Sequence, residues 1–292
     1  MVRNKSIGSR ITNAINYTVL GLLCVVTLYP FWNSFVLSIS SRASLVDSVL
    51  KIWPTEISLD PWIALMNSSF MWSSFMRSVV RTAAGTAFSL ACTVAMAYSL
   101  SKARLPHRKA IMVLVTFTML FNGGLIPTYM LVNNLGLINS TWALILPALV
   151  SPFNLIIVKN FFQSLSPSLE EAAILEGAND MYFFWKIALP LSKPIIATIT
   201  LWLMVDNWNS WFDAAIYIND RSKFLLQQVL QEMVAQVQID ASVFQTGNLA
   251  VPPLTESVQA ATTLFVTLPI LLVYPFIQKY FTQGIMIGSL KE

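Results

Sequence analysis

Long apolar runs constrain the fold of this chain more than any other feature of its sequence. They cover residues 15–38, 77–100, 110–131, 142–163, 195–218 and 258–279. About 20 helical residues cross the roughly 30 Å hydrocarbon layer of a bilayer, and each run reaches that length. A helix also satisfies its own backbone hydrogen bonds inside lipid. The runs therefore predict an all-α, polytopic membrane protein with six transmembrane helices.

The composition agrees with a bilayer as the surrounding solvent. Hydrophobic residues make up 55% of the 292 residues and charged residues only 11%, which is too apolar for one aqueous globule. The net charge of +4 comes from Lys and Arg scattered between apolar runs, so we expect no nucleic-acid partner. Cys24 and Cys92 lie inside apolar stretches without metal-site spacing and are interpreted as small core residues.

The distribution of basic residues predicts the orientation. If the N-terminus is inside, the inner segments hold Arg3, Lys5, Arg10, Lys102, Arg104, Arg108, Lys109, Lys159, Lys186, Lys193, Lys279 and Lys291. The outer loops hold Arg42, Lys51, Arg221 and Lys223, while Arg77 and Arg81 lie at a boundary where they can snorkel to the outer interface. The positive-inside rule then places both termini in the cytoplasm. The basic N-terminus lacks a cleavage site and leads into a run that we expect to be retained as the first span.

Two loops are longer than simple connectors and invite a functional interpretation. Residues 164–194 are expected in the cytoplasm and residues 219–257 outside. The inner loop has the pattern of two short helices around a glycine. The first helix can be capped by Ser166 with Pro167 at the first helical position, or by Ser168 with Glu171 three residues later.

The second half of the inner loop begins at Gly177, which allows a turn that a side chain would resist. Asn179 can cap the second helix, and Pro190 is expected to end it. The expected apolar stripes are Leu169, Ala172, Ala173 and Leu175 on the first helix and Met181, Phe184, Ile187 and Ala188 on the second.

This loop resembles the EAA signature of ABC importer permeases, which is Glu-Ala-Ala, three residues, Gly, nine residues, Ile, one residue and Leu-Pro. The residues in register are Glu171, Ala172, Ala173, Gly177, Ile187, Leu189 and Pro190. The resemblance implies that the loop docks on a cytoplasmic ATPase and passes its motion to the spans. Glu176 departs from the Asp that relatives commonly carry before the glycine. The alternative is an amphipathic helix lying on the membrane surface.

The resemblance extends to residues 124–147, 206–218 and 274–292, which are similar to the smaller, six-span permeases of maltose-type carbohydrate importers. It implies one permease domain of the MetI-like type I importer fold, with a core of about residues 75–285, in a bacterial cytoplasmic (inner) membrane. It also implies a second, different permease, two ATPase subunits, a solute-binding protein and an oligosaccharide substrate. No glycine precedes a lysine, so the chain lacks a Walker A loop. ATP and Mg are therefore expected on the partner subunits, with no cofactor and no enzymatic activity here.

A polar stripe on the fifth apolar run is the candidate lining of the translocation pathway. It consists of Trp202, Asp206, Asn209, Ser210, Asp213 and Tyr217, at helical spacing. A carboxylate near the bilayer centre costs roughly 2.5–3.5 kcal/mol, so Asp206 should face other helices or water. Carboxylate, amide and aromatic groups suit a sugar. The alternative is that these groups bond to neighbouring helices or to the partner permease.

Other sequence features leave alternatives open. The candidate contacts for the binding protein are Gln245, Thr246, Gly247 and Asn248 in the outer loop. An ion- or proton-coupled secondary sugar transporter, with Asp206 and Asp213 as coupling groups, is the competing function. A membrane enzyme would need His or Asp clusters, but His107 is the only histidine and is interpreted as a solvated loop residue. The resemblance favours larger or acidic oligosaccharides such as alginate-like uronates, whereas the two acids favour a neutral substrate.

Overall fold

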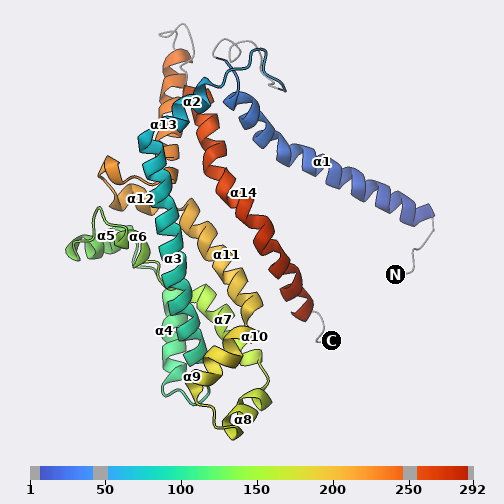
Figure 1. Cartoon of the computed structure of the whole chain (residues 1–292), viewed down its shortest axis with the longest axis vertical. Coiled ribbons are helices and arrows are strands. Elements are labelled where there is room, and N and C mark those ends of the chain that lie inside the picture. Colours follow the sequence, from blue (N-terminus) through green and yellow to red (C-terminus); the bar gives the residue numbers. More distant parts are fainter. Residues whose placement is uncertain (1–6, 42–51, 246–254, 289–292) are drawn as a thin grey trace. The chain divides into compact units, whose positions relative to one another are not determined.

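The described residues of this computed structural model, which are 7–41, 52–245 and 255–288, are almost entirely helical (Figure 1). They form no strand beyond one isolated antiparallel bridge between Ser40 and Ile57. The predicted all-α class is therefore confirmed. The chain divides into two compact units.

The first unit comprises Met1–Met71 and Leu230–Thr267. It holds α1 (Ile7–Ser38) and α2 (Asp60–Met66), with the beginning of α3 (Ser69–Ser101), most of α13 (Leu226–Gln245) and the beginning of α14 (Thr255–Gly288). The apolar window of α1 is only 6% buried, as expected for a helix whose solvent is lipid. The residues that follow α1 are anchored, because the Ser257 hydroxyl donates to the Ser40 carbonyl oxygen at 3.3 Å.

The second unit comprises Trp72–Val229 and Leu268–Glu292. Its further helices are α4 (Arg108–Leu120), α5 (Leu125–Asn134), α6 (Trp142–Ile145), α7 (Pro152–Ser164), α8 (Pro167–Leu175), α9 (Asp180–Phe183), a π-helical turn (Phe184–Ala188), α10 (Leu189–Leu191), α11 (Lys193–Asn209), α12 (Phe212–Tyr217) and a 3-10 turn (Arg221–Lys223). Its buried apolar cluster joins α3, α7, α8, α9 and α11, with Leu155, Val158 and Ile199 almost fully buried. This core fixes the short helices beside one end of α3.

Three helical windows are long and apolar enough to cross a membrane, in α1, α3 and α14. Two bent pairs also pass that test if each pair is counted as one span, which brings the number to five among the described residues. The predicted count of six stays a prediction. Helix α3 begins at Ser69, eight residues before the expected boundary at 77, and α14 extends beyond both expected ends of 258–279.

The stretch 110–131, expected to be one helix, is two helices that meet at an angle of 112°. Helix α4 ends before Phe121, whose backbone is extended, and α5 begins after Gly124 at φ +90°. The Asn122 side chain accepts a hydrogen bond from the Gly124 N–H at 2.9 Å. Two adjacent glycines and a competing amide side chain outweigh the apolar pattern at this point.

The stretch 142–163 is likewise divided, between α6 and α7. Pro152 lies inside this apolar stretch, where a proline would be expected to kink a continuous helix, but it begins α7 instead. The Ser151 side chain accepts a hydrogen bond from the Asn154 N–H as the N-cap. A proline lacks the N–H that would be unsatisfied in the first helical turn, so it is well placed there.

The stretch 195–218 ends its first helix at Asn209 and resumes at Phe212. Ser210 has extended backbone angles of φ −68° and ψ 112°, so the polar stripe does not lie on one continuous helical face. The prediction of a single face from Asp206 to Tyr217 is therefore wrong. Asp206 lies in the last turn of α11 and not in the middle of a straight helix.

Candidate functional site

The inner loop, residues 164–194, folds into short helices around a glycine as predicted, and is called the coupling loop below. Helix α8 begins at Pro167 with Ser166 at the N-cap position, which agrees with the first of the two capping alternatives. The Ser166 hydroxyl makes no cap hydrogen bond and instead lies 2.7 Å from the Ser168 hydroxyl. The position of the helix start was thus predictable, but the capping contact was not.

Gly177 forms the turn between α8 and α9 with φ +85°. Its N–H donates to the Ile174 carbonyl, and the Ala178 N–H donates to the Ala173 carbonyl, both at 2.9 Å. These two bonds form a Schellman motif, which requires the left-handed conformation that glycine adopts without strain. The Asn179 side chain then caps α9 by accepting from the Tyr182 N–H at 2.8 Å. The predicted turn and cap are both confirmed.

The second half of the coupling loop differs from a regular helix. After α9 the chain takes a π-helical turn, Phe184–Ala188, and then continues through α10 to Leu191. Pro190 does not end the helix itself, because the helix continues to the next residue and bends by 77° into α11. Single π-helical turns occur often at functional sites.

The coupling loop leaves most of its apolar side chains exposed. On α8 only Ala173 of the predicted stripe is buried, while Leu175 is 88% exposed. On the second stripe Phe184 and Ala188 are buried and Met181 is 64% exposed. Burial of Ala173, Phe184 and Ala188 fixes the loop on its unit. The exposed stripe residues, which are Leu169, Ala172, Leu175 and Met181, remain available to a partner.

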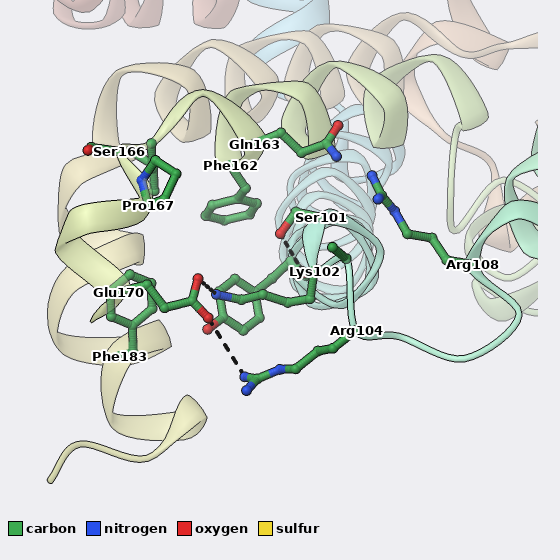
Figure 2. Close-up of a pocket in the computed structure, with 13 residues that line it drawn as sticks. Ser101, Lys102, Arg104, Arg108, Phe162, Gln163, Ser166, Pro167, Glu170 and Phe183 are labelled. Atoms are coloured by element: carbon green, nitrogen blue, oxygen red, sulfur yellow. Dashed lines mark hydrogen bonds and ion pairs between the residues drawn. The ribbon is translucent and has the colours of Figure 1, made fainter. Parts of the chain in front are cut away.

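A network of four charges ties the coupling loop to the end of α3. The Lys102 ammonium lies 2.7 Å from the Glu170 carboxylate on α8. Arg104 pairs with Asp180 at the start of α9 and lies 3.8 Å from Glu170. Figure 2 shows Lys102 and Arg104 both directed toward Glu170, beside a cavity of about 360 Å³.

Aromatic rings complete the surroundings of Lys102. Its ammonium lies 4.7 Å from the centre of the Tyr98 ring and 4.7 Å from the centre of the Phe183 ring. Attraction between a cation and an aromatic face strengthens as water is excluded. In the sequence analysis Lys102 contributed only to the predicted orientation, because no local pattern connects it with Glu170.

The candidate pathway residue Asp213 is the partner of a buried arginine. Its carboxylate accepts from Arg81 at 2.7 Å and from the Ala214 N–H at 2.9 Å, and the Ser210 hydroxyl also donates to it. The Arg81 side chain is only 3% exposed, and Arg81 also donates to the Asn207 carbonyl oxygen at the end of α11. The expectation that Arg81 snorkels to an interface is therefore wrong.

The remaining members of the polar stripe lie on two helices, α11 and α12. Asp206 and Asn209 are exposed, and Trp202 stacks on Phe153 with ring centres 6.1 Å apart. Tyr217 is buried and stacks on Tyr129. The break at Ser210 separates Tyr217 from Trp202, Asp206 and Asn209, which all lie on α11.

Asn139 organises a further polar cluster that the sequence analysis missed. It has φ +60°, and its side-chain oxygen accepts from the N–H groups of Asn219 and Asp220 at 2.7 and 2.9 Å. Hydrogen bonds from Ser222 lower the pKa of the Asp220 carboxyl. The Lys223 ammonium donates to the Asn139 carbonyl oxygen at 3.1 Å. The cluster fixes the start of the expected outer loop.

The candidate contacts for a binding protein fall at the edge of the described residues. Gln245 is the last residue of α13. Thr246, Gly247 and Asn248 lie outside the described residues.

Residues 87–287 match the family described as binding-protein-dependent transport system inner membrane component. The chain belongs to this family. The matched region contains the whole coupling loop together with the Arg81 partner Asp213. The predicted family, its helical fold and a function as a permease of an ABC transporter are therefore confirmed.

Individual relatives of this permease cover nearly all of it. The protein LplC of Bacillus subtilis (strain 168) is 42% identical over 97% of this chain and 96% of its own length. The polygalacturonan/rhamnogalacturonan transport system permease protein YtcP of the same organism is 41% identical over 97% of this chain and 99% of its own. A chain from the crystal structure of a bacterial ABC transporter involved in the import of the acidic polysaccharide alginate has a TM-score of 0.86, with 31% identity, over 96% of this chain and 100% of that chain.

Proposed function

We propose that this permease forms half of the translocation pathway of an ATP-driven oligosaccharide importer, beside a second, different permease. A solute-binding protein delivers the sugar, and two partner ATPase subunits bind ATP and Mg and drive transport. The assembly lies in a bacterial cytoplasmic membrane, with both termini of this chain in the cytoplasm. The observation that carries the proposal is the coupling loop, which holds the EAA signature on a glycine turn and leaves several large apolar side chains exposed.

The chemistry of the coupling loop favours a protein partner over the membrane surface. Leu175, Met181 and Trp185 are 88%, 64% and 58% exposed and offer an apolar contact. Glu171 and Glu176 are exposed on the same loop, and anionic lipid headgroups would repel them. A cleft with an apolar floor and a basic rim matches both features, and such a cleft on the ATPase is the proposed docking site.

An acidic oligosaccharide is the proposed substrate, and the pairing of Asp213 removes one objection to it. Two free acids, Asp206 and Asp213, would repel an anionic sugar, but the positive charge of Arg81 balances that of Asp213. The relative YtcP transports polygalacturonan or rhamnogalacturonan, and the similar solved chain belongs to an alginate importer. Trp202, Asp206 and Asn209 remain candidate pathway residues. The pairing of Asp213 also removes one of the two coupling groups that an ion- or proton-coupled transporter would need.

Purification and reconstitution test the proposal. Tagged permease isolated from its native membrane should bring down an ATPase and a second permease. In proteoliposomes, loaded binding protein should stimulate ATP hydrolysis with uronate oligosaccharides more than with neutral ones of equal length. Transport by this permease alone would refute the importer assignment, and equal stimulation by neutral sugars would refute the acidic substrate.

We also propose that residues 240–253 of the outer loop contact the binding protein. Gln245, Thr246, Gly247 and Asn248 lie in a long polar segment on the expected outer side. Shortening this segment should abolish stimulation of ATP hydrolysis by loaded binding protein while the purified complex keeps its subunits. Unchanged stimulation would contradict this contact.

A further inference from the structure

Lys102 contacts the coupling loop on both sides of its glycine turn. It directly follows Ser101, the last residue of α3. Its ammonium lies 2.7 Å from Glu170 on α8 and 4.7 Å from the Phe183 ring centre on α9. Because Gly177 separates α8 from α9, one side chain joins both short helices to α3.

Burial shows which ion pair of the network matters most. The Lys102 and Glu170 side chains are 15% and 32% exposed, whereas those of Arg104 and Asp180 are 55% and 61% exposed. Water and salt screen exposed pairs, which contribute little. A pair with one partner largely withdrawn from water interacts more strongly. The Lys102–Glu170 pair therefore dominates the network.

Helix α8 has few other attachments to the rest of its unit. Ala173 is its single buried residue, and the structure describes all nine residues of the helix. A small alanine methyl offers little contact area to resist sliding. The ion pair between Glu170 and Lys102 is thus the main directional contact between α8 and α3.

Helix α3 leads from this contact toward the polar stripe. It is a single helix of 33 residues, and it also carries Arg81. Arg81 binds Asp213 and the Asn207 carbonyl oxygen, on either side of the break at Ser210. A displacement of α3 along its axis would therefore change the contacts where the candidate pathway residues lie.

We propose that Lys102 is the positioning residue that joins the coupling loop to α3, so that motion of the loop moves α3 and the Arg81 contacts. The proposal rests on the proposed function, since it assumes that an ATPase moves the loop. Lys102 acts through Glu170 and Phe183, and it is not a docking contact for the ATPase. A permease without the Lys102 charge should therefore still bind the ATPase but transport poorly.

The test compares Lys102→Met with the parent in the reconstituted complex. Methionine keeps an apolar stem against the rings and removes the charge. We expect about a tenfold loss of transport and of binding-protein-stimulated ATP hydrolysis, which is within the range of coupling between contacting residues. The ATPase should still copurify, and a cysteine at the exposed Ala172 should still cross-link to it. Lys102→Arg should restore most of the stimulation. Lys109→Gln, which removes an exposed lysine in the first turn of α4, should leave the stimulation unchanged.

A double-mutant cycle isolates the contact with Glu170. Glu170→Gln should reproduce the loss, and the double variant Lys102→Met/Glu170→Gln should be no worse than either single variant. Parental stimulation by Lys102→Met, or additive losses in the double variant, would overturn the proposal. Loss of the ATPase from Lys102→Met would also overturn it, because the residue would then serve folding or docking. Failure of the parent to copurify with an ATPase would instead overturn the proposed function.

Discussion

Replacing Asp213 by asparagine should destabilise the permease, because it leaves a buried guanidinium without its counter-ion. Breaking a fully buried ion pair costs roughly 3–5 kcal/mol. Arg81 is 3% exposed but Asp213 is 27% exposed, and Arg81 also keeps its bond to the Asn207 carbonyl oxygen. The asparagine oxygen can accept one hydrogen bond in place of the carboxylate. We therefore expect a loss of about 2 kcal/mol in the free energy of unfolding.

The measurement is the unfolding midpoint of the purified complex in lipid nanodiscs, followed by tryptophan fluorescence during a denaturing-detergent titration. Asp206→Asn is the matched control, because that exposed carboxylate lies just before the same helix break and should leave the midpoint unchanged. The double variant Arg81→Met/Asp213→Leu should recover most of the lost stability by removing both charges. A parental midpoint for Asp213→Asn would refute the buried pair. Reduced transport by the stable Asp206→Asn variant would support its place in the pathway.

Three further substitutions test local geometry. Gly85→Ala would place a Cβ 2.5 Å from the Asn207 side-chain oxygen and should lower the free energy of unfolding by about 1–3 kcal/mol in the same titration. Gly21→Ala is the control, because its Cβ meets no atom within 4 Å and should change the free energy of unfolding little. Gly177→Val also meets no atom within 4 Å, but φ +85° strains a β-branched residue, so binding-protein-stimulated ATP hydrolysis should fall. Gly177→Asn should lower this rate less, because asparagine tolerates the left-handed conformation better. A parental rate for Gly177→Val would contradict the strain. Asn179→Ala removes the cap of α9, which should cost about 1 kcal/mol and speed hydrogen exchange at the start of that helix. Asn179→Asp keeps a capping oxygen and should leave the exchange rate unchanged. Unchanged exchange in Asn179→Ala would show that the cap is dispensable.

The coupling loop was the most predictable part of the structure, because its determinants are local. Gly177 and Asn179 specify a helix end and a helix start within three residues of sequence, and both were confirmed. The spacing of the apolar stripes is also local information, whereas the burial of Ala173, Phe184 and Ala188 depends on packing against the rest of the unit. What the sequence did not predict was the partner of Glu170, because Lys102 belongs to a different helix end.

The apolar runs were poor guides to where helices stop. Hydropathy averaged over 20 residues is insensitive to two glycines at 123–124 or to an extended Ser210, yet each ends a helix. The role of a proline inside an apolar run is hidden for a related reason. Pro152 has the same effect on mean hydropathy whether it kinks a helix or begins one, and only the backbone shows that it begins α7.

The sequence by itself determined the all-α membrane class, the family and the local form of the coupling loop, since apolar length, motif spacing and capping are properties of contiguous residues. Only the tertiary structure decided which charged residues are paired. Asp213 and its partner Arg81 are 132 residues apart, and Arg104 and Asp180 are 76 apart. Electrostatic energy depends on distance in space and on burial, and neither quantity is written in the order of residues along the chain.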